Sequence, residues 1–502
     1  MLLLFFIVVP FFSSIICLLF FNKKTILPFF ITLLTSVGCL IVSIYIFYKK
    51  FFLLNNLSNN SLFLLDFQKI WLPEFGISFH LRLDSLSLLM IILTSLISCI
   101  AVMCDWNINY KNSGLFYFYF LLTILGFFGV FLSEDLFLFF LFWELTIFPL
   151  YFLILYWHNE ELNIQFVSQT IKKFFVYSQI SGMFLLISIL YLVQEYYNLT
   201  GLLTFDYLIL QKVILPFNKE FFLMLGFFLA FIIKMPIFPF QDWYSNIHLC
   251  TPASGSIDIL GFLLKTSLYG FLRFNLCFFP NVLSIFFKIG NFLSFLTIFY
   301  NIFLVYTQNN IKKIITSLSM IHIGIIFLAL NNINQFSYQG MFLYFVSCTL
   351  ITSALFIIIK NLKENFNTYN IFSYIKLSQN FTSLSSFFLF FLLINIGIPG
   401  TGNFSGEILI LLGSFLISPI LVSIVVFNLL FLVGFILKII VSMYYGPENK
   451  VSFIQKNVFF SYILLYWIIF LIFLIGIFPQ IVFNFSTSWF TFISQKNLFF
   501  LI

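Results

Sequence analysis

Long apolar runs, each bounded by a few polar positions, follow one another along almost the whole chain. The first two, Met1–Phe21 and Ile26–Tyr48, are joined by a short turn that contains Lys23 and Lys24. A helix needs about 20 apolar residues to cross a bilayer, so the runs predict roughly 14 transmembrane helices. The pattern predicts an all-α, polytopic membrane protein in which residues 49–84 form the longest loop.

The composition agrees with this class of protein and excludes others. Of the 502 residues, 62% are hydrophobic and only 8% are charged, which rules out a water-soluble domain. The net charge of +7 is too small to indicate nucleic acid as a partner, so we expect membrane lipids and other membrane proteins instead. Half of the 24 Lys and Arg, among them Lys172 and Lys312, fall in odd-numbered loops. The positive-inside rule then places these loops on the matrix or cytoplasmic side and both termini on the outer side.

The aromatic content carries information about the genome. Aromatic residues make up 22% of the chain, with 80 Phe and 24 Tyr, which is more than aromatic belts at the two membrane interfaces use. Together with many Ile, Asn and Lys this favours an AT-rich coding bias, and no basic leader precedes the first apolar run. We therefore expect a mitochondrially encoded, multi-pass protein of the mitochondrial inner membrane. A bacterial protein with a similar bias is the alternative.

The cysteines and histidines give no sign of a cofactor site. The seven Cys are scattered without a C-x-x-C pair, and the four His are equally dispersed. Iron–sulfur clusters and structural zinc sites need clustered ligands. We therefore expect that this chain binds no cofactor and no metal, and that any redox chemistry belongs to partner subunits.

Two charged residues lie inside apolar runs next to prolines. Glu144 lies about ten residues into its run, hence near the middle of the membrane, and Pro149 loosens the helix after it. Lys234 is followed by Pro236 and Pro239. A charge buried in a membrane marks an ion pathway by default, and a helix broken beside a charge is typical of transporters. A permanently paired carboxylate and a lysine that extends to the interface are the structural alternatives.

Four further polar residues follow, three on one predicted helix and the fourth on a later apolar run. Asp258 and Lys265 are seven residues apart on one predicted helix and so lie on nearly the same face. Arg273, near the end of that helix, is expected to be an interface anchor. His322 lies in the middle of an apolar run and titrates near neutral pH, which suits a proton relay. A hydrogen-bonded core histidine is the alternative for His322.

The last candidates lie in the C-terminal part of the chain. Glu407 belongs to the run Phe387–Phe415, which Pro399 is expected to break. Lys438, in the run Leu421–Tyr445, either joins an exit route or extends to the interface. The full set of candidate site residues is Glu144, Lys234, Asp258, Lys265, His322, Glu407 and Lys438.

Three motifs carry a resemblance to a known family. They read WELTIFPLYFL from Trp143, KMPIFPFQDW from Lys234 and SGSIDILGFLLKTS from Ser254. These stretches resemble the antiporter-like membrane subunits of respiratory complex I, and within that family the chain 4 branch. The chain departs from the usual pattern at Asn310, where many members carry Asp, and at Cys348, where they carry a second histidine.

The resemblance implies a function for the whole chain. It implies a proton-translocating subunit that works through Glu144, Lys234, Lys265, His322 and Glu407. The electron transfer from NADH to ubiquinone, through FMN and iron–sulfur clusters, would take place in other subunits of the complex. The implied partners are other membrane-arm subunits, including the chain 2 and chain 5 antiporter-like relatives.

The resemblance and the two proline breaks together predict the domain organisation. Residues 1–112 hold the N-terminal helices, residues 113–279 and 280–447 form two inverted five-helix repeats, each with a broken helix, and residues 448–502 hold a C-terminal helix and tail. Two other classes of function remain open from the sequence. One is a stand-alone cation/proton antiporter, and the other is a structural membrane spacer.

Overall fold

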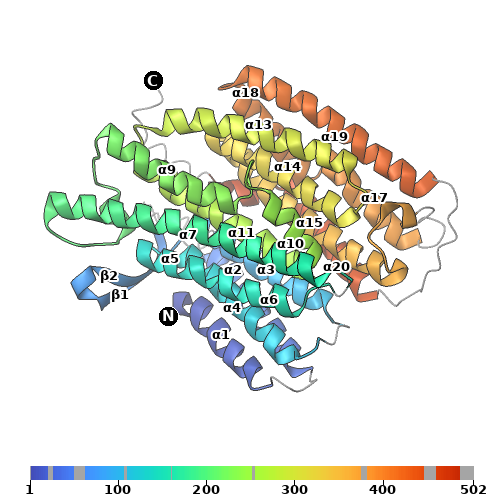
Figure 1. The fold of residues 1–502 in the computed structure, drawn as a ribbon, viewed down its shortest axis with the longest axis horizontal. Helices are drawn as coiled ribbons and strands as arrows, with labels where there is room; N and C mark the ends of the chain where they lie inside the picture. The colour runs from blue at the N-terminus through green and yellow to red at the C-terminus, as the bar shows by residue number, and fades with distance from the viewer. Residues whose placement is uncertain are drawn as a thin grey trace. The chain divides into compact units, whose positions relative to one another are not determined.

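The computed structural model describes residues 2–20, 26–49, 63–106, 110–159, 161–251, 255–374, 382–445 and 459–486. These residues are mostly helical (Figure 1), which confirms the prediction of an all-α, polytopic membrane protein. Within them, ten helices are long and apolar enough to cross a membrane. Leu2–Leu18 and Thr382–Ile396 are shorter apolar helices.

The chain forms two compact units, and each is built from more than one stretch of the sequence. The first unit contains Met1–Met235 and Gly261–Ser284, and the second contains Pro236–Leu260 and Ile285–Thr487. The first change from one unit to the other follows Met235, one residue after Lys234. The two inverted repeats are a division by internal similarity, and they stay a prediction.

The first unit packs around two buried helices. Its elements are α1 (Leu2–Leu18), α2 (Leu27–Tyr48), β1 (Phe63–Leu72), η2 (Pro73–Phe75), β2 (Ile77–Asp84), α3 (Ser85–Cys104), α4 (Ser113–Leu132), α5 (Leu136–Leu145), α6 (Ile147–Tyr156), α7 (Ile164–Thr200), α8 (Tyr207–Leu210), α9 (Phe217–Lys234), the later part of α11 (Gly255–Gly270), η3 (Phe271–Asn275) and α12 (Leu276–Phe278). Helix α1 packs along α4, α2 against α3, and α7 against α9. Helices α3 and α4 are the most buried of the unit's candidate spans and form its core.

The second unit is built in the same way. Its elements are α10 (Asp242–Cys250), α13 (Leu283–Thr307), α14 (Ile311–Asn331), α15 (Gln335–Phe366), η4 (Ile371–Tyr374), α17 (Thr382–Ile396), α18 (Gly402–Phe415), α19 (Pro419–Tyr445) and α20 (Phe459–Ile477). Helix α15 packs mainly against α18 and also contacts α14 and α20. Helices α14 and α15 are almost completely buried, whereas most of α19 and α20 is open to the surroundings.

Helices are interrupted where the prolines predict a break. Helix α5 ends at Leu145 and α6 begins at Ile147, so Thr146 forms a joint close to Pro149. Helix α9 ends at Lys234, and α10 begins only at Asp242. The predicted spans through Lys234 and through Glu407 are therefore each divided into separate helices.

The third break carries a clear backbone signal. Between the end of α17 at Ile396 and the start of α18 at Gly402, Gly397 and Gly400 have φ angles of +96° and +89°. Residues with a Cβ rarely adopt this conformation, so the two glycines allow the chain to turn here.

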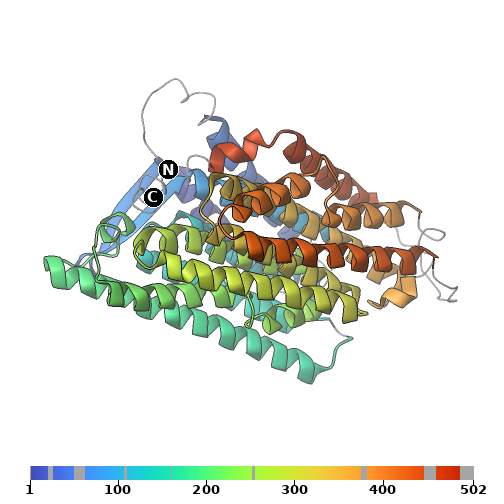
Figure 2. The same cartoon turned by 90° about the horizontal axis from the view of Figure 1, so that it is seen from above.

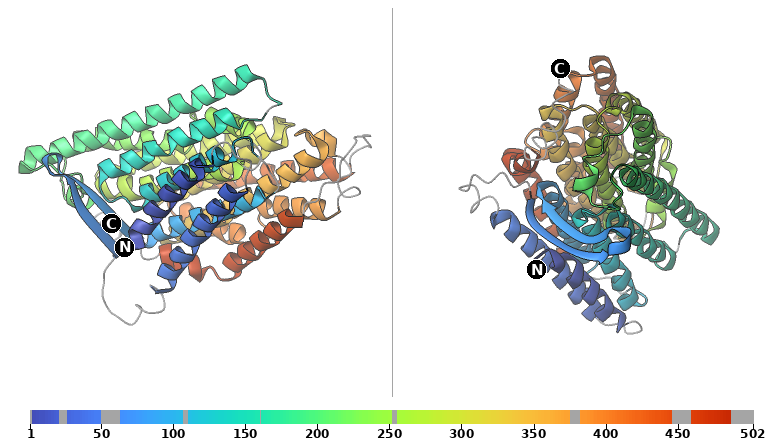
Figure 3. Two further views of the ribbon diagram at one scale, coloured as in Figure 1. Left: turned by 90° about the horizontal axis from the view of Figure 1, so that it is seen from below. Right: turned by 90° about the vertical axis from the view of Figure 1, so that its left-hand side faces the viewer.

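A β-hairpin occupies the described part of the predicted 49–84 loop. Strands β1 and β2 pair antiparallel, with Phe67 opposite Leu81 and Gln68 opposite His80. Figures 2 and 3 show the hairpin beside the end of α7, within the first unit. The prediction of a plain loop is wrong for residues 63–84. The sequence signal of the hairpin is the alternation of polar residues at His80, Arg82 and Asp84. It follows a turn that contains Gly76, whose φ is +68°.

Candidate functional site

Lys234 is a buried lysine held by neutral groups. It is the last residue of α9, and only 3% of its surface is exposed. Its Nζ lies 3.5 Å from the centroid of the Trp143 ring and donates a 3.5 Å hydrogen bond to Thr146 Oγ1. A ring face attracts a cation more strongly when water is excluded. The ammonium is therefore stabilised without direct neutralisation of its charge.

Glu144 lies between those two contacts along the chain. It is half-buried near the end of α5, and its Oε2 accepts a 2.9 Å hydrogen bond from Gln179 Nε2 of α7. Gly182, one turn further along α7, makes room for the carboxylate. A Cβ at this glycine would lie 1.9 Å from Glu144 Oε1, which is far inside contact distance.

Glu144 and Lys234 act on each other through space. Each is the Coulombic partner of the other. The ion pairs within 4 Å in the described part of the chain do not include this one. Two charges that attract each other without contact can each change protonation state when the other moves. This arrangement has the properties of a proton-exchange site.

Lys265 and Asp258 lie on α11, as predicted. Lys265 is 1% exposed, so the lysine is buried and not extended to an interface. The side chain of Asp258 falls outside the described residues, so a shared face with Lys265 stays a prediction. Helix α11 ends in the π-helical turn η3, which contains Arg273.

His322 is held on both sides by hydrogen bonds. It lies on α14 with 3% of its surface exposed. Its Nδ1 is 2.6 Å from the Tyr344 hydroxyl of α15, and its Nε2 is 2.8 Å from Asn395 Oδ1 at the end of α17. Because the amide oxygen only accepts, Nε2 carries the proton of the neutral ring and Nδ1 accepts from the tyrosine. This geometry fits a relay, and it fits the structural alternative as well.

Glu407 lies close to this histidine's partners. It is half-buried on α18, and a Cβ at Gly397 would lie 3.9 Å from its Oε2. It acts electrostatically on Tyr344 and on Cys348. The buried Cys348 thiol is 3.0 Å from Asn403 Oδ1. A thiol is a weaker donor than the histidine that the resemblance leads us to expect at this position.

The remaining cations of the second unit differ in burial. Lys438 is exposed on α19, and its Nζ lies 4.4 Å above the ring of Tyr306. Lys312, which we expected in a loop, is instead fully buried in the first turn of α14 and donates to the Thr251 carbonyl at 2.5 Å. His248 is buried on α10 and stacks on Phe356 with 5.0 Å between ring centroids.

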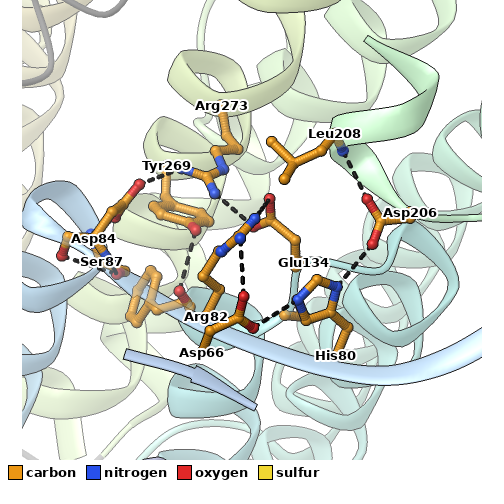
Figure 4. A network of polar contacts seen from close by, with 12 residues as sticks. Asp66, His80, Arg82, Asp84, Ser87, Glu134, Asp206, Leu208, Tyr269 and Arg273 are labelled. Atoms are coloured by element: carbon orange, nitrogen blue, oxygen red, sulfur yellow. Dashed lines mark hydrogen bonds and ion pairs between the residues drawn. The ribbon is translucent and has the colours of Figure 1, made fainter. Parts of the chain in front are cut away.

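A network of charged residues fastens the hairpin to the helices of the first unit (Figure 4). We call these residues the hairpin cluster: Asp66, His80, Arg82, Asp84, Glu134, Asp206 and Arg273. Arg273 pairs with Asp84 and, at 2.6 Å, with Glu134. Arg82 joins Glu134, at 3.5 Å, to Asp66, at 2.8 Å. Sequence reasoning missed this cluster because its members come from five separate segments.

Arg273 and Asp84 each have a clear structural role in this region. Arg273 is 3% exposed and pairs with two buried carboxylates, so the prediction of an interface anchor is wrong. Asp84 caps α3 as part of a capping box with Ser87.

His80 is the titratable centre of the hairpin cluster. Its Nδ1 lies 2.7 Å from Asp206 Oδ2, and its Nε2 lies 2.8 Å from Asp66 Oδ1. Burial alone would lower the pKa of His80, but the hydrogen bonds to Asp206 and Asp66 and their charges outweigh it, so the pKa is raised. Burial would raise the pKa of Asp206, and the bond to His80 keeps it below its usual range instead.

Breaks in helices, buried lysines and half-buried carboxylates beside them define an antiporter-like class of multi-pass membrane protein. Residues 133–432 match the family described as NADH:quinone oxidoreductase/Mrp antiporter, TM. The chain belongs to this family.

Relatives and solved structures agree with the family. The NADH-quinone oxidoreductase subunit M of Buchnera aphidicola subsp. Baizongia pistaciae is 40% identical over 448 residues, which are 88% of each chain. The NADH-ubiquinone oxidoreductase chain 4 of Chondrus crispus is 34% identical over 72% of each chain. A chain of respiratory complex I from Thermus thermophilus with bound NADH has the same fold, with a TM-score of 0.85 and 20% identity over 99% of this chain and 100% of that one.

Proposed function

We propose that this chain is a proton-translocating membrane-arm subunit of an NADH:quinone oxidoreductase of the complex I type. The names of the relatives at 40% and 34% identity support this assignment. One observation carries the mechanism. Lys234 is a buried lysine at a helix break whose Nζ contacts Trp143 and Thr146, and Glu144 lies between these two residues in the sequence.

The remaining candidate residues extend the route. Lys265 and Asp258 would take the proton from Lys234, and His322 and Glu407 would pass it on. Lys438 would serve at the exit. Each of these groups binds a proton reversibly, and water would link those that do not touch. The Tyr344 hydroxyl, which contacts His322 and feels the charge of Glu407, supports a link between these last two.

The partners and cofactors follow from the same proposal. The chain would lie beside other membrane-arm subunits, including the chain 2 and chain 5 antiporter-like relatives. NADH, FMN, iron–sulfur clusters and ubiquinone would bind to other subunits, and this chain would bind none of them. The scattered positions of the seven cysteines support this part of the proposal.

The location is a multi-pass position in a membrane. The mitochondrial inner membrane is our finer prediction, and it rests on the coding bias. The bacterial relative at 40% identity favours a bacterial membrane as the alternative. Location of the gene, on an organellar or a bacterial chromosome, decides between them.

The test uses the assembled complex in proteoliposomes. We expect that Glu144→Gln and Lys234→Met each abolish proton translocation, by roughly 100-fold or more, while the complex still assembles. Lys172→Met, the same change at an exposed lysine of α7, is the matched control and should pump normally. Normal pumping by both Glu144→Gln and Lys234→Met would contradict the proposal and favour a structural spacer.

An Mrp-type cation/proton antiporter is the second candidate because the matched family includes such antiporters. It predicts proton movement that depends on Na⁺ or K⁺ and continues without quinone reduction. Proton movement that follows quinone reduction and ignores both cations would exclude it.

A further inference from the structure

The hairpin cluster does not belong to the route described above, although it lies in the same unit as Lys265. It contains four carboxylates and two arginines. Its formal charge is therefore −2 when His80 is neutral and −1 when His80 is protonated. Excess negative charge away from bulk water favours the binding of a proton. The arginines stay charged at all relevant pH values, so His80 is the member best placed to hold that proton.

The surroundings of His80 connect a buried region with water. Its partner Asp206 is 10% exposed, whereas its partner Asp66 is 46% exposed. Each carboxylate contacts a different ring nitrogen, so a protonated ring donates to both at once. The charged groups that face His80 from the surrounding elements are Asp66 on β1, Arg82 on β2, Glu134 and Asp135 before α5, and Asp206 before α8. The proton can therefore leave through Asp66 to the surface.

The buried end of the cluster meets the helix that carries Lys265. Lys265, Tyr269 and Arg273 are spaced by four residues along α11 and η3, which is one turn or about 6 Å per step. Figure 4 shows the Tyr269 ring beside Arg273, and its hydroxyl donates to the Phe131 carbonyl at 3.1 Å. A line of polar groups therefore runs from the buried lysine to the cluster.

We propose that the hairpin cluster is a proton-release site, in which His80 holds a proton shared with Asp66 and Asp206 and passes it to water at the hairpin surface. This inference rests on the proposed function and assigns that function one end of its route. Arg82 and Arg273 are positioning residues that hold Glu134, Asp66 and Asp84 in place. The proton passes from the imidazolium to water, which leaves the ring neutral, and the next proton arrives from the α11 side through water.

The predicted topology gives the direction. The hairpin belongs to the second loop, which the positive-inside rule places opposite the basic odd-numbered loops. Release on this side is the direction in which a respiratory enzyme moves protons. A low pH at the hairpin surface would keep His80 protonated and slow its release of the proton.

The experiment compares His80→Gln with the native complex in proteoliposomes, over about pH 6 to 9 on the hairpin side, where a histidine with a raised pKa titrates. The native complex should pump more slowly as this pH falls below the pKa of His80. In His80→Gln, whose amide keeps hydrogen bonds but does not titrate, this inflection should disappear and the rate should fall roughly tenfold. His158→Gln, at a histidine whose Nδ1 lies 3.0 Å from Leu155 O at its own helix end, should match the native complex.

A second variant covers the case in which His80→Gln fails to assemble. Asp206→Asn keeps the helix cap of α8 but removes a charge that raises the pKa of His80, so the inflection should move to lower pH. The inference would be overturned if His80→Gln kept the native pumping rate and the native inflection of the pH profile. It would also be overturned if the inflection did not move in Asp206→Asn. Either result would leave the cluster with a structural role alone. The comparison with Glu144→Gln separates the two proposals. If that variant stops pumping while His80→Gln behaves as native, only the release site is wrong.

Discussion

The hairpin cluster and the Lys234 region treat charge in opposite ways. In the cluster, arginines contact carboxylates directly, at distances such as 2.6 and 2.8 Å. Around Lys234, the ammonium contacts a ring and a hydroxyl, and the carboxylate of Glu144 bonds to an amide. An arginine stays charged and so fixes the charge of the carboxylates that it contacts, whereas neutral partners leave the charges of Lys234 and Glu144 free to change. The same unit thus holds charges in direct arginine–carboxylate pairs in one place and among neutral partners in the other.

The largest expected effect comes from breaking a direct pair. Arg273→Met would leave Glu134 and Asp84 buried without their shared cation, so we expect a loss of about 3 to 5 kcal/mol in the free energy of unfolding. Thermal loss of helical circular dichroism in mild detergent measures it. Lys173→Met changes an exposed lysine of α7 and should not change the midpoint measurably. Equal midpoints for Arg273→Met and the native chain would show that the cluster does not stabilise the fold.

A smaller effect comes from crowding the separated pair. A methyl group at Gly182 would overlap Glu144 Oε1, so Gly182→Ala should displace the carboxylate and cost about 1 to 3 kcal/mol. We also expect reduced proton translocation, measured as for Glu144→Gln. Gly434→Ala adds the same methyl group where nothing lies within 4 Å and serves as the control. Native translocation in Gly182→Ala would mean that the exact position of Glu144 is unimportant.

The neutral partners of His322 offer a third comparison. Asn395→Ala removes the acceptor of Nε2, and the loss of one buried hydrogen bond should cost about 1 kcal/mol. Asn428→Ala, which removes an amide that donates only to its own helix at Ile424, should cost less. If both variants have the same thermal midpoint and both pump normally, His322 needs no fixed partner.

The smallest expected effect is a dependence of stability on pH. The pKa of His80 is raised in the folded chain, so its contribution is complete below the unfolded value of about 6.5 and is lost as the pH rises through the folded value. The pKa of Asp206 is lowered, so its contribution is present above about 3.9 and is lost as the pH falls through the folded value. The thermal midpoint of the native chain should therefore exceed that of His80→Gln most clearly between about pH 3.9 and about pH 6.5. A difference that grows above pH 7 would contradict this sign.

The sequence predicted local features well. Prolines at 149, 236, 239 and 399 marked the interruptions because a proline removes a helical hydrogen bond wherever it occurs. The motifs around Glu144 and Lys234 predicted the family, and the match over residues 133–432 confirms it. These features depend on neighbours in the chain, so a single sequence contains them.

What the sequence did not reveal depends on contacts between distant segments. Arg273 was read as an interface anchor because its partners Asp84 and Glu134 are more than a hundred residues away. No sequence motif marks Gly182, and only the structure shows that it faces Glu144. The hairpin was different. The alternation of its polar residues is typical of a strand. A segment between two membrane helices is more often a loop, so the sequence analysis predicts a loop here.

The way the hairpin joins α5 has a mechanical consequence. Ser78 of β2 donates its backbone N–H to Asp135, and the same carboxylate caps the first turn of α5. Helix α5 is then a rod of about 15 Å with the strand attached at one end and Glu144 near the other. A displacement of β2 would therefore move α5 and, with it, the carboxylate of Glu144. The backbone at Thr146 would bend and limit how far this movement reaches α6.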